Sequence, residues 1–279
     1  MFLVFGQTGQ LARELAELLP DAQFLGRDAA DLADPKACAE LINQTEAAAI
    51  INAAAWTDVD GAESQRGAAF RVNADAPKAM AEAAAARGIP FVHISTDYVF
   101  DGSGTTPWAP DHKTDPVNIY GESKRQGEIG VVAAAGTYAV LRTAWVFSPF
   151  GKNFVKSMLH HGAIRDEMRI VADQTGGPTP AHAIAAACVE IARDLIADPS
   201  KSGIYHFSGA PDVTWAEFAR EIFSQTGNPI PVQDIETKEF PTPAKRPANS
   251  RLDCATTQSV FGITRPDWRV ELKNVLARI

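Results

Sequence analysis

The stretch Phe2-Leu3-Val4-Phe5-Gly6-Gln7-Thr8-Gly9-Gln10-Leu11-Ala12 decides how this chain folds. Its four apolar residues have the length of a buried β-strand, and they run directly into a glycine turn and then a helical pattern. The stretch matches G-x-x-G-x-x-G except that Ala12 stands at the third glycine position, where alanine can still provide close helix-to-strand packing. It predicts a strand, a turn and a helix whose N-terminus can hold a phosphate group.

The rest of the first half repeats this alternation. Short β-rich runs predict strands at 23–26, 49–52, 91–95 and 138–143, and alanine-rich runs predict helices at 10–19, 35–45, 67–87 and 117–135. Strands separated by helices of this length form βαβ units and a parallel sheet. We therefore expect an α/β fold with a Rossmann-type, doubly wound parallel sheet, in which residues 1–147 form a dinucleotide-binding domain.

The second half has a different texture, with loops rich in Gly, Pro and Asn from about Ser148 onward. Helices are predicted at 153–161, 181–197, 215–226 and 269–278, and strands at 169–171 and 204–207. Residues 148–279 are expected to form mainly a smaller C-terminal substrate-binding lobe that closes over the ends of the sheet. The alanine-rich helix at 181–198 is expected to return to the first domain.

Composition excludes several classes of protein. The chain has 279 residues, 46% of them hydrophobic, and a net charge of −8 from 34 acids and 26 bases, which argues against general nucleic-acid affinity. No apolar run approaches the roughly 20 residues of a membrane span. Cys38, Cys188 and Cys254 lack C-x-x-C spacing, so neither a disulfide framework nor a zinc site is indicated. The apolar N-terminus lacks a basic leader, and the expected location is cytoplasmic.

Cofactor-binding residues are predicted at the ends of the first three strands. The loop would approach a pyrophosphate through the backbone of Gly6, Gly9, Gln10 and Leu11. After the second strand, Arg27 stands where an acid would select NAD, and its charge favours the 2′-phosphate of NADPH, with NADH as the alternative.

Two further segments have the place of cofactor contacts. Asp31 and Leu32 fit an adenine-side turn, although Asp34 before Pro35 also fits a simple helix cap. The third strand is followed by small residues past which a cofactor can run closely: Ala53, Ala54, Ala55 and Thr57. Helix packing explains the first two of these equally well.

A phenol and an ammonium group stand four residues apart in Tyr120-Gly-Glu-Ser-Lys124, which follows Ser95-Thr96-Asp97 in the chain. This spacing places both on one helix face. The charge of Lys124 would favour ionised Tyr120 and draw a phenol pKa of about 10 toward physiological pH, which suits a proton donor in carbonyl reduction. Such a pair is also common on solvated helix faces, so the surrounding motifs must support the chemistry.

Taken together, these motifs resemble the extended short-chain dehydrogenase/reductase superfamily, and within it the dTDP-4-dehydrorhamnose reductase family. The resemblance extends over nearly the whole chain through S-T-D-Y-V-F-D-G at 95–102, R-T-A-W-V-F at 142–147, D-Q-T-G-G-P-T at 173–179 and R-P-A-N-S-R-L at 246–252. It implies an NAD(P)H-dependent oxidoreductase that reduces the C4 keto group of dTDP-4-dehydro-β-L-rhamnose to dTDP-L-rhamnose, in dTDP-rhamnose and polysaccharide biosynthesis.

The resemblance also implies roles for individual residues. Tyr120 is the proton donor, Lys124 holds the nicotinamide ribose and lowers the pKa of Tyr120, and Thr96 hydrogen-bonds the substrate carbonyl. Four further residues are implied to contact the sugar nucleotide: Asp97, Trp145, Asn153 and Arg246. A core tryptophan and a surface salt bridge are the alternative interpretations of Trp145 and Arg246.

Two other functions stay open. An epimerase or dehydratase of the same superfamily oxidises and then re-reduces its sugar, but Tyr98 stands where dehydratases have a proton-abstracting glutamate, which argues against dehydration. A non-enzymatic regulatory subunit, like the relatives that partner methionine adenosyltransferase, is the third hypothesis. Intact Thr96, Tyr120 and Lys124 favour an enzyme.

Some reductases of this family carry Mg²⁺ held by glutamates at a dimer interface. Glu14 stands at one such position, but His182 stands at a second and the chain up to Ile279 supplies no obvious third ligand. We therefore expect no metal, and the adjacent His160 and His161 point apart on a helix. The expected partner is a dTDP-deoxyhexose substrate, and a homodimer is compatible with the resemblance.

Overall fold

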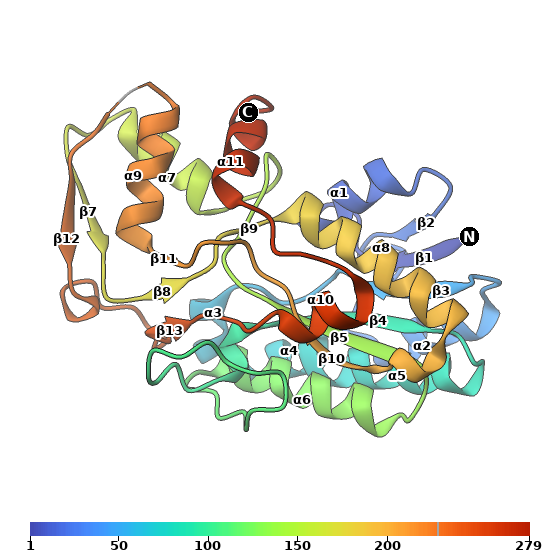
Figure 1. The fold of residues 1–279 in the computed structure, drawn as a ribbon. Coiled ribbons are helices and arrows are strands. Elements are labelled where there is room, and N and C mark those ends of the chain that lie inside the picture. The colour runs from blue at the N-terminus through green and yellow to red at the C-terminus, as the bar shows by residue number, and fades with distance from the viewer. Residues whose placement is uncertain (228) are drawn as a thin grey trace.

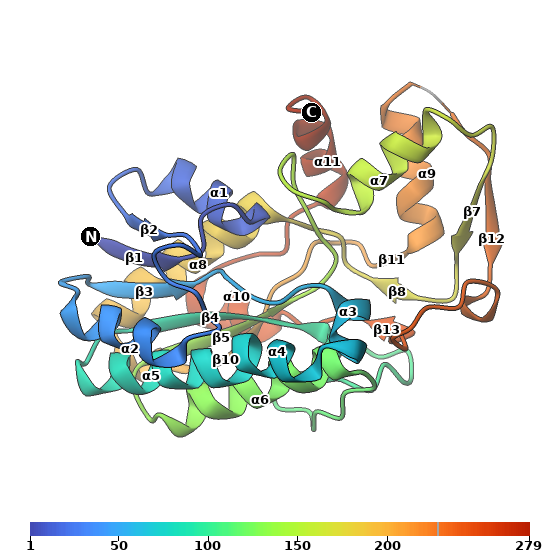
Figure 2. The same cartoon turned by 180° about the vertical axis from the view of Figure 1, so that it is seen from behind.

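A parallel sheet of six strands forms the centre of the computed structural model, which describes residues 1–227 and 229–279 (Figures 1 and 2). The strand order is β10-β5-β4-β3-β1-β2, and every neighbouring pair is parallel. The strands are β1 (Phe2–Phe5), β2 (Gln23–Leu25), β3 (Ala49–Asn52), β4 (Phe91–Thr96), β5 (Tyr138–Thr143) and β10 (Gly203–His206). The predicted fold class is confirmed.

Helices cover both faces of this sheet. One face carries α1 (Gln10–Leu18) and α8 (Ala181–Ala197), and the other carries α2 (Pro35–Gln44), α5 (Ala76–Ala86) and α6 (Ile119–Ala133) (Figure 1). The strands are buried on both sides, which explains why they read as continuous apolar runs rather than as alternating ones. The two resulting hydrophobic layers hold the carboxyl ends of the strands in fixed positions.

Residues 204–207 need a correction. The predicted boundary at residue 147 assigns this strand to the smaller lobe. In the structure, β10 instead pairs with β5 and extends the main sheet. The helix α10 (Ala255–Phe261) packs close to it, with Phe261 in the same core as Tyr205. The domain boundary at residue 147 stays a prediction. After entering the smaller lobe, the chain returns to the sheet domain first at α8 and β10 and again at α10.

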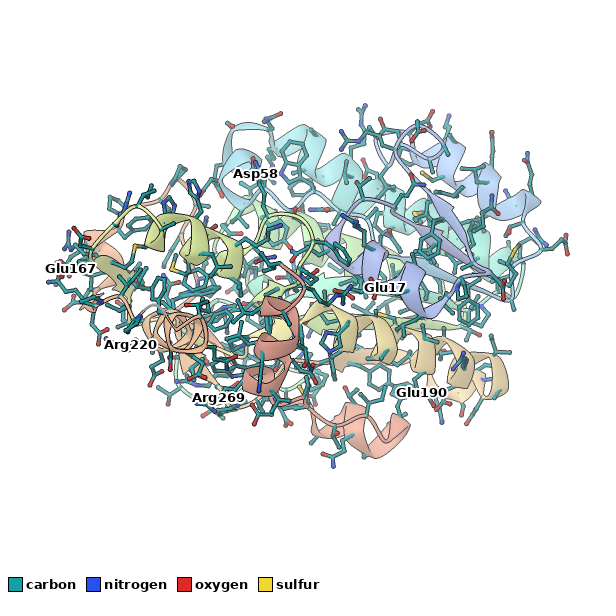
Figure 3. All side chains as sticks on the ribbon, turned by 90° about the horizontal axis from the view of Figure 1, so that it is seen from above. Glu17, Asp58, Glu167, Glu190, Arg220 and Arg269 are labelled. Atoms are coloured by element: carbon teal, nitrogen blue, oxygen red, sulfur yellow. The ribbon has the colours of Figure 1, made fainter. Side chains whose placement is uncertain are left out.

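The remaining elements form a smaller lobe beside the ends of the strands. It contains α7 (Phe154–Gly162), β7 (Met168–Val171), α9 (Trp215–Gln225), β12 (Val232–Ile235) and α11 (Trp268–Leu276), whose apolar faces share one core. Short strands connect it to the sheet: β6 (Val146–Phe147), β8 (Thr175–Gly176), β9 (Thr179–Pro180), β11 (Val213–Thr214) and β13 (Asn249–Ser250). Figure 3 shows α11 between α9, which carries Arg220, and α8, which carries Glu190.

The helix predicted at 67–87 is interrupted. The chain forms α3 (Val59–Ser64) and α4 (Arg66–Phe70), then a wider π-helical turn at Arg71–Asp75, and only then α5. Pro77 has no N–H to donate to the carbonyl of Asn73, four residues earlier, so a regular α-helical bond is missing at this point. The backbone and side chain of Asn73 are thereby free to contact the neighbouring helix α6 and the segment after β3.

Within the described residues, no helix is both long enough and apolar enough to cross a membrane.

Candidate active site

The glycine loop joins β1 to α1 at the point where the strand order reverses, between β1 and β3. Gly6 has φ +114°, a conformation that side chains rarely adopt, and a Cβ there would lie 3.4 Å from the backbone of Ala53 and Ala54. Gly9 is the N-cap of α1 and brings no capping side chain, so the amides of the first turn are open to an anion. A Cβ at Gly9 would meet nothing within 4 Å.

This geometry fits the cofactor predicted from the sequence. The room at Gly9 allows a phosphate to approach the backbone amides of Gln10 and Leu11, and Ala53 lies next to the loop at the end of β3. Arg27 is exposed just after β2, where it can reach a 2′-phosphate at the edge of the site. Asp31 accepts a hydrogen bond from Ala33, and Leu32 is buried. The roles of these residues toward a cofactor stay predictions.

The carboxyl end of β4 brings Thr96, Asp97 and Tyr120 together. Thr96 is the last residue of the strand, and Thr96 Oγ1 donates to Asp97 Oδ1 at 3.1 Å and accepts from the Tyr98 amide at 3.2 Å. Tyr120 lies in the first turn of α6, where its phenol is close to the hydroxyl of Thr96. The ring of Tyr98 meets that of Tyr120 edge to face, with centroids 5.6 Å apart. Two residues separated by 24 positions therefore face one point.

Helix α6 reaches this position because its glycines allow close packing. A Cβ at Gly121 would lie 2.1 Å from the carbonyl oxygen of Tyr98, and one at Gly127 would lie 2.1 Å from that of Asn73. The helix begins at the Asn118 cap, whose side chain accepts from the Gly121 amide at 2.7 Å. Close contact with the backbone after β4 fixes where Tyr120 and Lys124 lie.

The expected pKa of Tyr120 needs a correction. Burial, together with nearby Asp97, raises the pKa of this phenol to about 12, although the neighbouring Thr96 hydroxyl acts in the opposite direction. Lys124 therefore does not bring the phenol toward neutral pH in this structure. The reason is that removal from water raises the free energy of the phenolate by more than the neighbouring groups lower it. Tyr120 is consequently protonated at neutral pH, the form that a proton donor needs.

Lys124 is fully buried, which is unusual for a lysine. Its Nζ donates to the Ile94 carbonyl at 2.7 Å and lies 3.4 Å from Nε2 of His93. Burial lowers the pKa of Lys124 to about 8, although Glu128 acts in the opposite direction. The amine therefore titrates near the pH at which the protein works.

Asp97 is a buried carboxyl group at the base of the site. Burial raises its pKa to about 7, whereas the nearby hydroxyls of Ser250 and Thr96 lower it. Within the described residues, Oδ2 of Asp97 makes no hydrogen bond of good geometry. Such an atom suits a polar ligand group, which agrees with the predicted contact between Asp97 and the sugar.

Trp145 stands where β5 leaves the sheet, and its backbone is left-handed with φ +48°. Its ring stacks on Trp215 at a centroid distance of 3.5 Å and lies against Gly176, where a Cβ would come within 2.9 Å of the indole. Since β5 is next to β4 and Thr143 is paired with Thr96, Trp145 borders the site at the next strand end. It is partly exposed there and also packs against two hydrophobic clusters, so its contact with the sugar stays a prediction.

Asn153 and Arg246 are engaged within the chain rather than turned toward a ligand. The Asn153 side chain caps α7 through Lys156 and donates to Gln10 Oε1 at 2.9 Å and to Ser148 O at 2.7 Å. Arg246 forms a salt bridge with Asp60 at 2.9 Å. The alternative reading of Arg246 as a salt-bridge residue thus describes its contacts, and the nucleotide contacts of both residues stay predictions.

Several residues of the site carry no signal in the sequence. Trp215 stacks on Trp145 from 70 positions away, and Ser250 lies beside Asp97 from 153 positions away. No periodicity links residues at such separations. For Ser250, its place in the R-P-A-N-S-R-L motif was the only available pointer.

The acids considered for Mg²⁺ have other partners. Glu14 is buried on α1 and contacts the Arg278 guanidinium at 3.3 Å, while His182 pairs with Glu271 at 2.9 Å. These side chains line an open pocket of about 280 Å³ between α1, α8 and α11. Among the described residues, no group of three or more His, Cys, Asp and Glu side chains has the arrangement of a metal site. The cation that meets Glu14 is an arginine of this chain.

A glycine loop at the reversal point of a parallel sheet, together with a Thr, Tyr and Lys constellation at the end of β4, two strands away, defines an oxidoreductase of the extended short-chain dehydrogenase/reductase class. The family model described as the RmlD substrate binding domain matches residues 1–279. The chain belongs to this family, that of the dTDP-4-dehydrorhamnose reductases.

Similar proteins cover nearly the full length. A dTDP-4-dehydrorhamnose reductase of Sinorhizobium fredii is 44% identical over 98% of this chain and 95% of its own. The crystal structure of such a reductase from Clostridium acetobutylicum has a TM-score of 0.91 and 34% identity, covering 99% of this chain and 98% of that one. The Bacillus anthracis reductase, solved in complex with NADP, has a TM-score of 0.92 and 32% identity, covering 100% and 99%.

Proposed function

We propose that this protein reduces the C4 keto group of dTDP-4-dehydro-β-L-rhamnose with NADPH to give dTDP-L-rhamnose. The observation that carries the proposal is the proximity of Tyr120 to Thr96 at the end of β4, at the same edge of the sheet as the glycine loop. The names of the full-length relatives and the NADP complex of the Bacillus anthracis enzyme support the same reaction and cofactor. Cytoplasmic location and a homodimer stay predictions.

In this proposal, bound NADPH supplies the hydride to C4, and the chain manages the charge and the proton. Thr96 and Tyr120 hydrogen-bond the keto oxygen, which becomes negative only as hydride arrives. Tyr120 donates its proton to that oxygen, because an alkoxide is more basic than a phenolate even when the phenol pKa is about 12. Lys124, one turn further along α6, would hold the nicotinamide ribose.

Two side chains bordering the site favour a deoxysugar as the substrate. The partly exposed Trp145, held in place by Trp215 and Gly176, offers apolar surface to a sugar ring and its methyl group. Asp97 offers a buried oxygen to a sugar hydroxyl. The same arrangement argues against dehydration, because Tyr98 occupies the position of the dehydratase base and only meets Tyr120 edge to face.

The decisive assay mixes purified protein with the dTDP-keto-sugar and either NADPH or NADH. Reduction requires one NADPH oxidised per sugar converted, followed by absorbance at 340 nm and by mass spectrometry of the product. Conversion of the sugar without net loss of NADPH would instead identify an epimerase. Absence of any conversion, with intact NADPH binding, would favour the regulatory-subunit hypothesis.

The Tyr120→Phe variant tests the proton donor. Its kcat should fall about 100-fold or more, because the acid that protonates the alkoxide is lost, while the Kd for NADPH stays within a few-fold of the wild-type value. Tyr138→Phe is a matched control, since this tyrosine lies at the opposite, amino end of β5. Wild-type turnover by Tyr120→Phe would refute the assignment.

A further inference from the structure

The buried contact between His93 and Lys124 has no role in the proposed mechanism. His93 lies in β4 with no exposed surface, between Asn52 at the end of β3 and Lys124 on α6. Its Nδ1 is 3.2 Å from Asn52 Nδ2, and its Nε2 is 3.4 Å from Lys124 Nζ. Which of the two ring nitrogens carries the proton determines what kind of contact Lys124 makes.

The hydrogen bonds of Asn52 settle that question. The Ala54 amide can only donate, and it meets Asn52 at 3.2 Å, so the atom it meets is the carbonyl oxygen Oδ1. The Asn52 atom facing His93 is then the amide nitrogen Nδ2, which can only donate. His93 Nδ1 is therefore the acceptor, and the single proton of the neutral ring is on Nε2, directed at Lys124.

The protonation state of Lys124 decides whether its contact with this donor is favourable. An ammonium group has no lone pair, so Nε2–H and a charged Lys124 are two donors facing each other across 3.4 Å. A neutral amine has one lone pair, which can accept from Nε2–H while an N–H still donates to the Ile94 carbonyl at 2.7 Å. His93 thus matches the neutral form of Lys124 better than the charged form.

The other charges around Lys124 do not remove this preference. On α6, Glu128 lies one turn beyond Lys124, but it is held by Arg142 of β5 in a buried ion pair at 2.7 Å, which offsets much of its charge. Tyr120 lies one turn before Lys124, and Asp97 follows β4. Burial lowers the pKa of His93 well below its usual value, so the ring stays neutral at working pH.

We propose that His93 is a positioning residue that, through its Nε2–H, stabilises the neutral amine of Lys124. Lys124 therefore gives up its proton at a lower pH than it would without His93. The ammonium form has the donors that would hold the nicotinamide ribose, so turnover should fall as pH rises through the Lys124 midpoint. The statement about turnover rests on the proposed function; the one about protonation does not.

The first test needs no substrate and no variant. Ring nitrogens of ¹⁵N-histidine-labelled wild-type protein are observed by long-range proton–nitrogen correlation between pH 5 and 8. His206 serves as an internal contrast: its pKa is lowered to about 3 by burial, its Nδ1–H donates to the Trp108 carbonyl at 3.0 Å, and its Nε2 faces Arg142. We expect His93 and His206 both to stay neutral, in opposite tautomers. A charged His93 ring, or a His93 ring with its proton on Nδ1, overturns the proposal.

The second test measures the titration of Lys124 by its ¹³Cε shift, and the pH profile of the single-turnover rate with NADPH and keto-sugar. His93→Leu removes the donor, and the midpoint of Lys124 should rise by about one pH unit, with the alkaline limb of the rate moving equally. His93→Gln, whose amide can donate from a similar position, should restore most of the wild-type midpoint. Ser95→Ala, a buried change on the same strand, is the control.

The two readouts separate this proposal from the proposed function. An unchanged Lys124 midpoint in His93→Leu overturns the role of His93, whatever the substrate is. A shifted midpoint in a protein that reduces no keto-sugar would leave the protonation inference standing and sink the reductase assignment.

Discussion

At the scale of single residues, burial decides the protonation state of this site more than neighbouring charge does. Tyr120, Lys124 and Asp97 are each shifted toward the neutral form, because each loses water when it folds into the end of the sheet. The expectation that Lys124 would lower the pKa of Tyr120 considered only charge. Tyr120 is consequently neutral at neutral pH, and Lys124 and Asp97 titrate closer to neutral pH than they would in water.

Asp97 provides a prediction for stability against pH. The folded protein keeps the Asp97 proton up to a pH of about 7, whereas the unfolded chain releases it near the ordinary value of 3.8. The free energy of unfolding attributable to Asp97 is thus highest below pH 4 and falls as pH rises toward 7, by at most about 4 kcal/mol. Asp97→Asn should remove this dependence. Urea unfolding at pH 4.5 and 7.5 checks it, and equal pH dependence of the two proteins would contradict it.

At the scale of elements, the position of α6 depends on glycines that would weaken an isolated helix. At Gly121 and Gly127, a Cβ would lie only 2.1 Å from a backbone carbonyl oxygen of another segment, so neither position has room for a side chain. The helix loses propensity but gains the contact that holds Tyr120 beside Thr96. Helix α5 shows the converse, since Pro77 forces a π-helical turn that aims Asn73 at α6.

Gly127→Ala tests this balance. Helix propensity alone predicts stabilisation by about 1 kcal/mol, but the added methyl group would collide with the Asn73 carbonyl, and we expect a loss of about 1–3 kcal/mol together with a lower kcat. Gly67→Ala is the matched control, because an exposed Cβ there meets nothing within 4 Å and should be neutral or stabilising. Urea unfolding separates the two, and stabilisation by Gly127→Ala would show that α6 is not packed as described.

The sequence predicted most elements closely, and its failures have common physical causes. Strands β1, β3 and β5 and helix α8 have the predicted bounds, because buried strands appear as short continuous apolar runs and the helix as a long alanine-rich one. The short helices α3 and α10 were missed, since six or seven residues do not establish a period. Strand 204–207 was found, but its place beside β5 depends on partners more than 60 positions away.

At the scale of the whole molecule, buried and half-buried ion pairs join the smaller lobe to the sheet domain. Arg278, at the end of α11, contacts Glu14 and Glu17 of α1, and Arg246 reaches Asp60 of α3. Ser148 also donates to Glu14 at 3.2 Å where the chain leaves the sheet. These contacts fix the smaller lobe relative to the sheet domain, which carries Asp97 and Tyr120.

Arg278→Met tests the contribution of this connection. The change leaves the Glu14 carboxylate, which is only 1% exposed, without its cation, and we expect a loss of about 2 kcal/mol in the free energy of unfolding. Glu17→Gln breaks the more exposed half of the same contact and should cost less than about 1 kcal/mol. Chemical denaturation of both variants decides the matter, and equal losses would mean that the burial of Glu14 is unimportant.

The sequence by itself determined the parallel sheet, the glycine loop and the four-residue spacing of Tyr120 and Lys124, because each is written in residues close together along the chain. Only the tertiary structure decided that Asn153 and Arg246 are engaged by the protein itself, that Trp145 rests on Trp215, and that His93 directs a proton at Lys124. These contacts join distant segments, and their chemistry depends on burial and on the direction of each hydrogen bond. Neither quantity exists until the chain has folded.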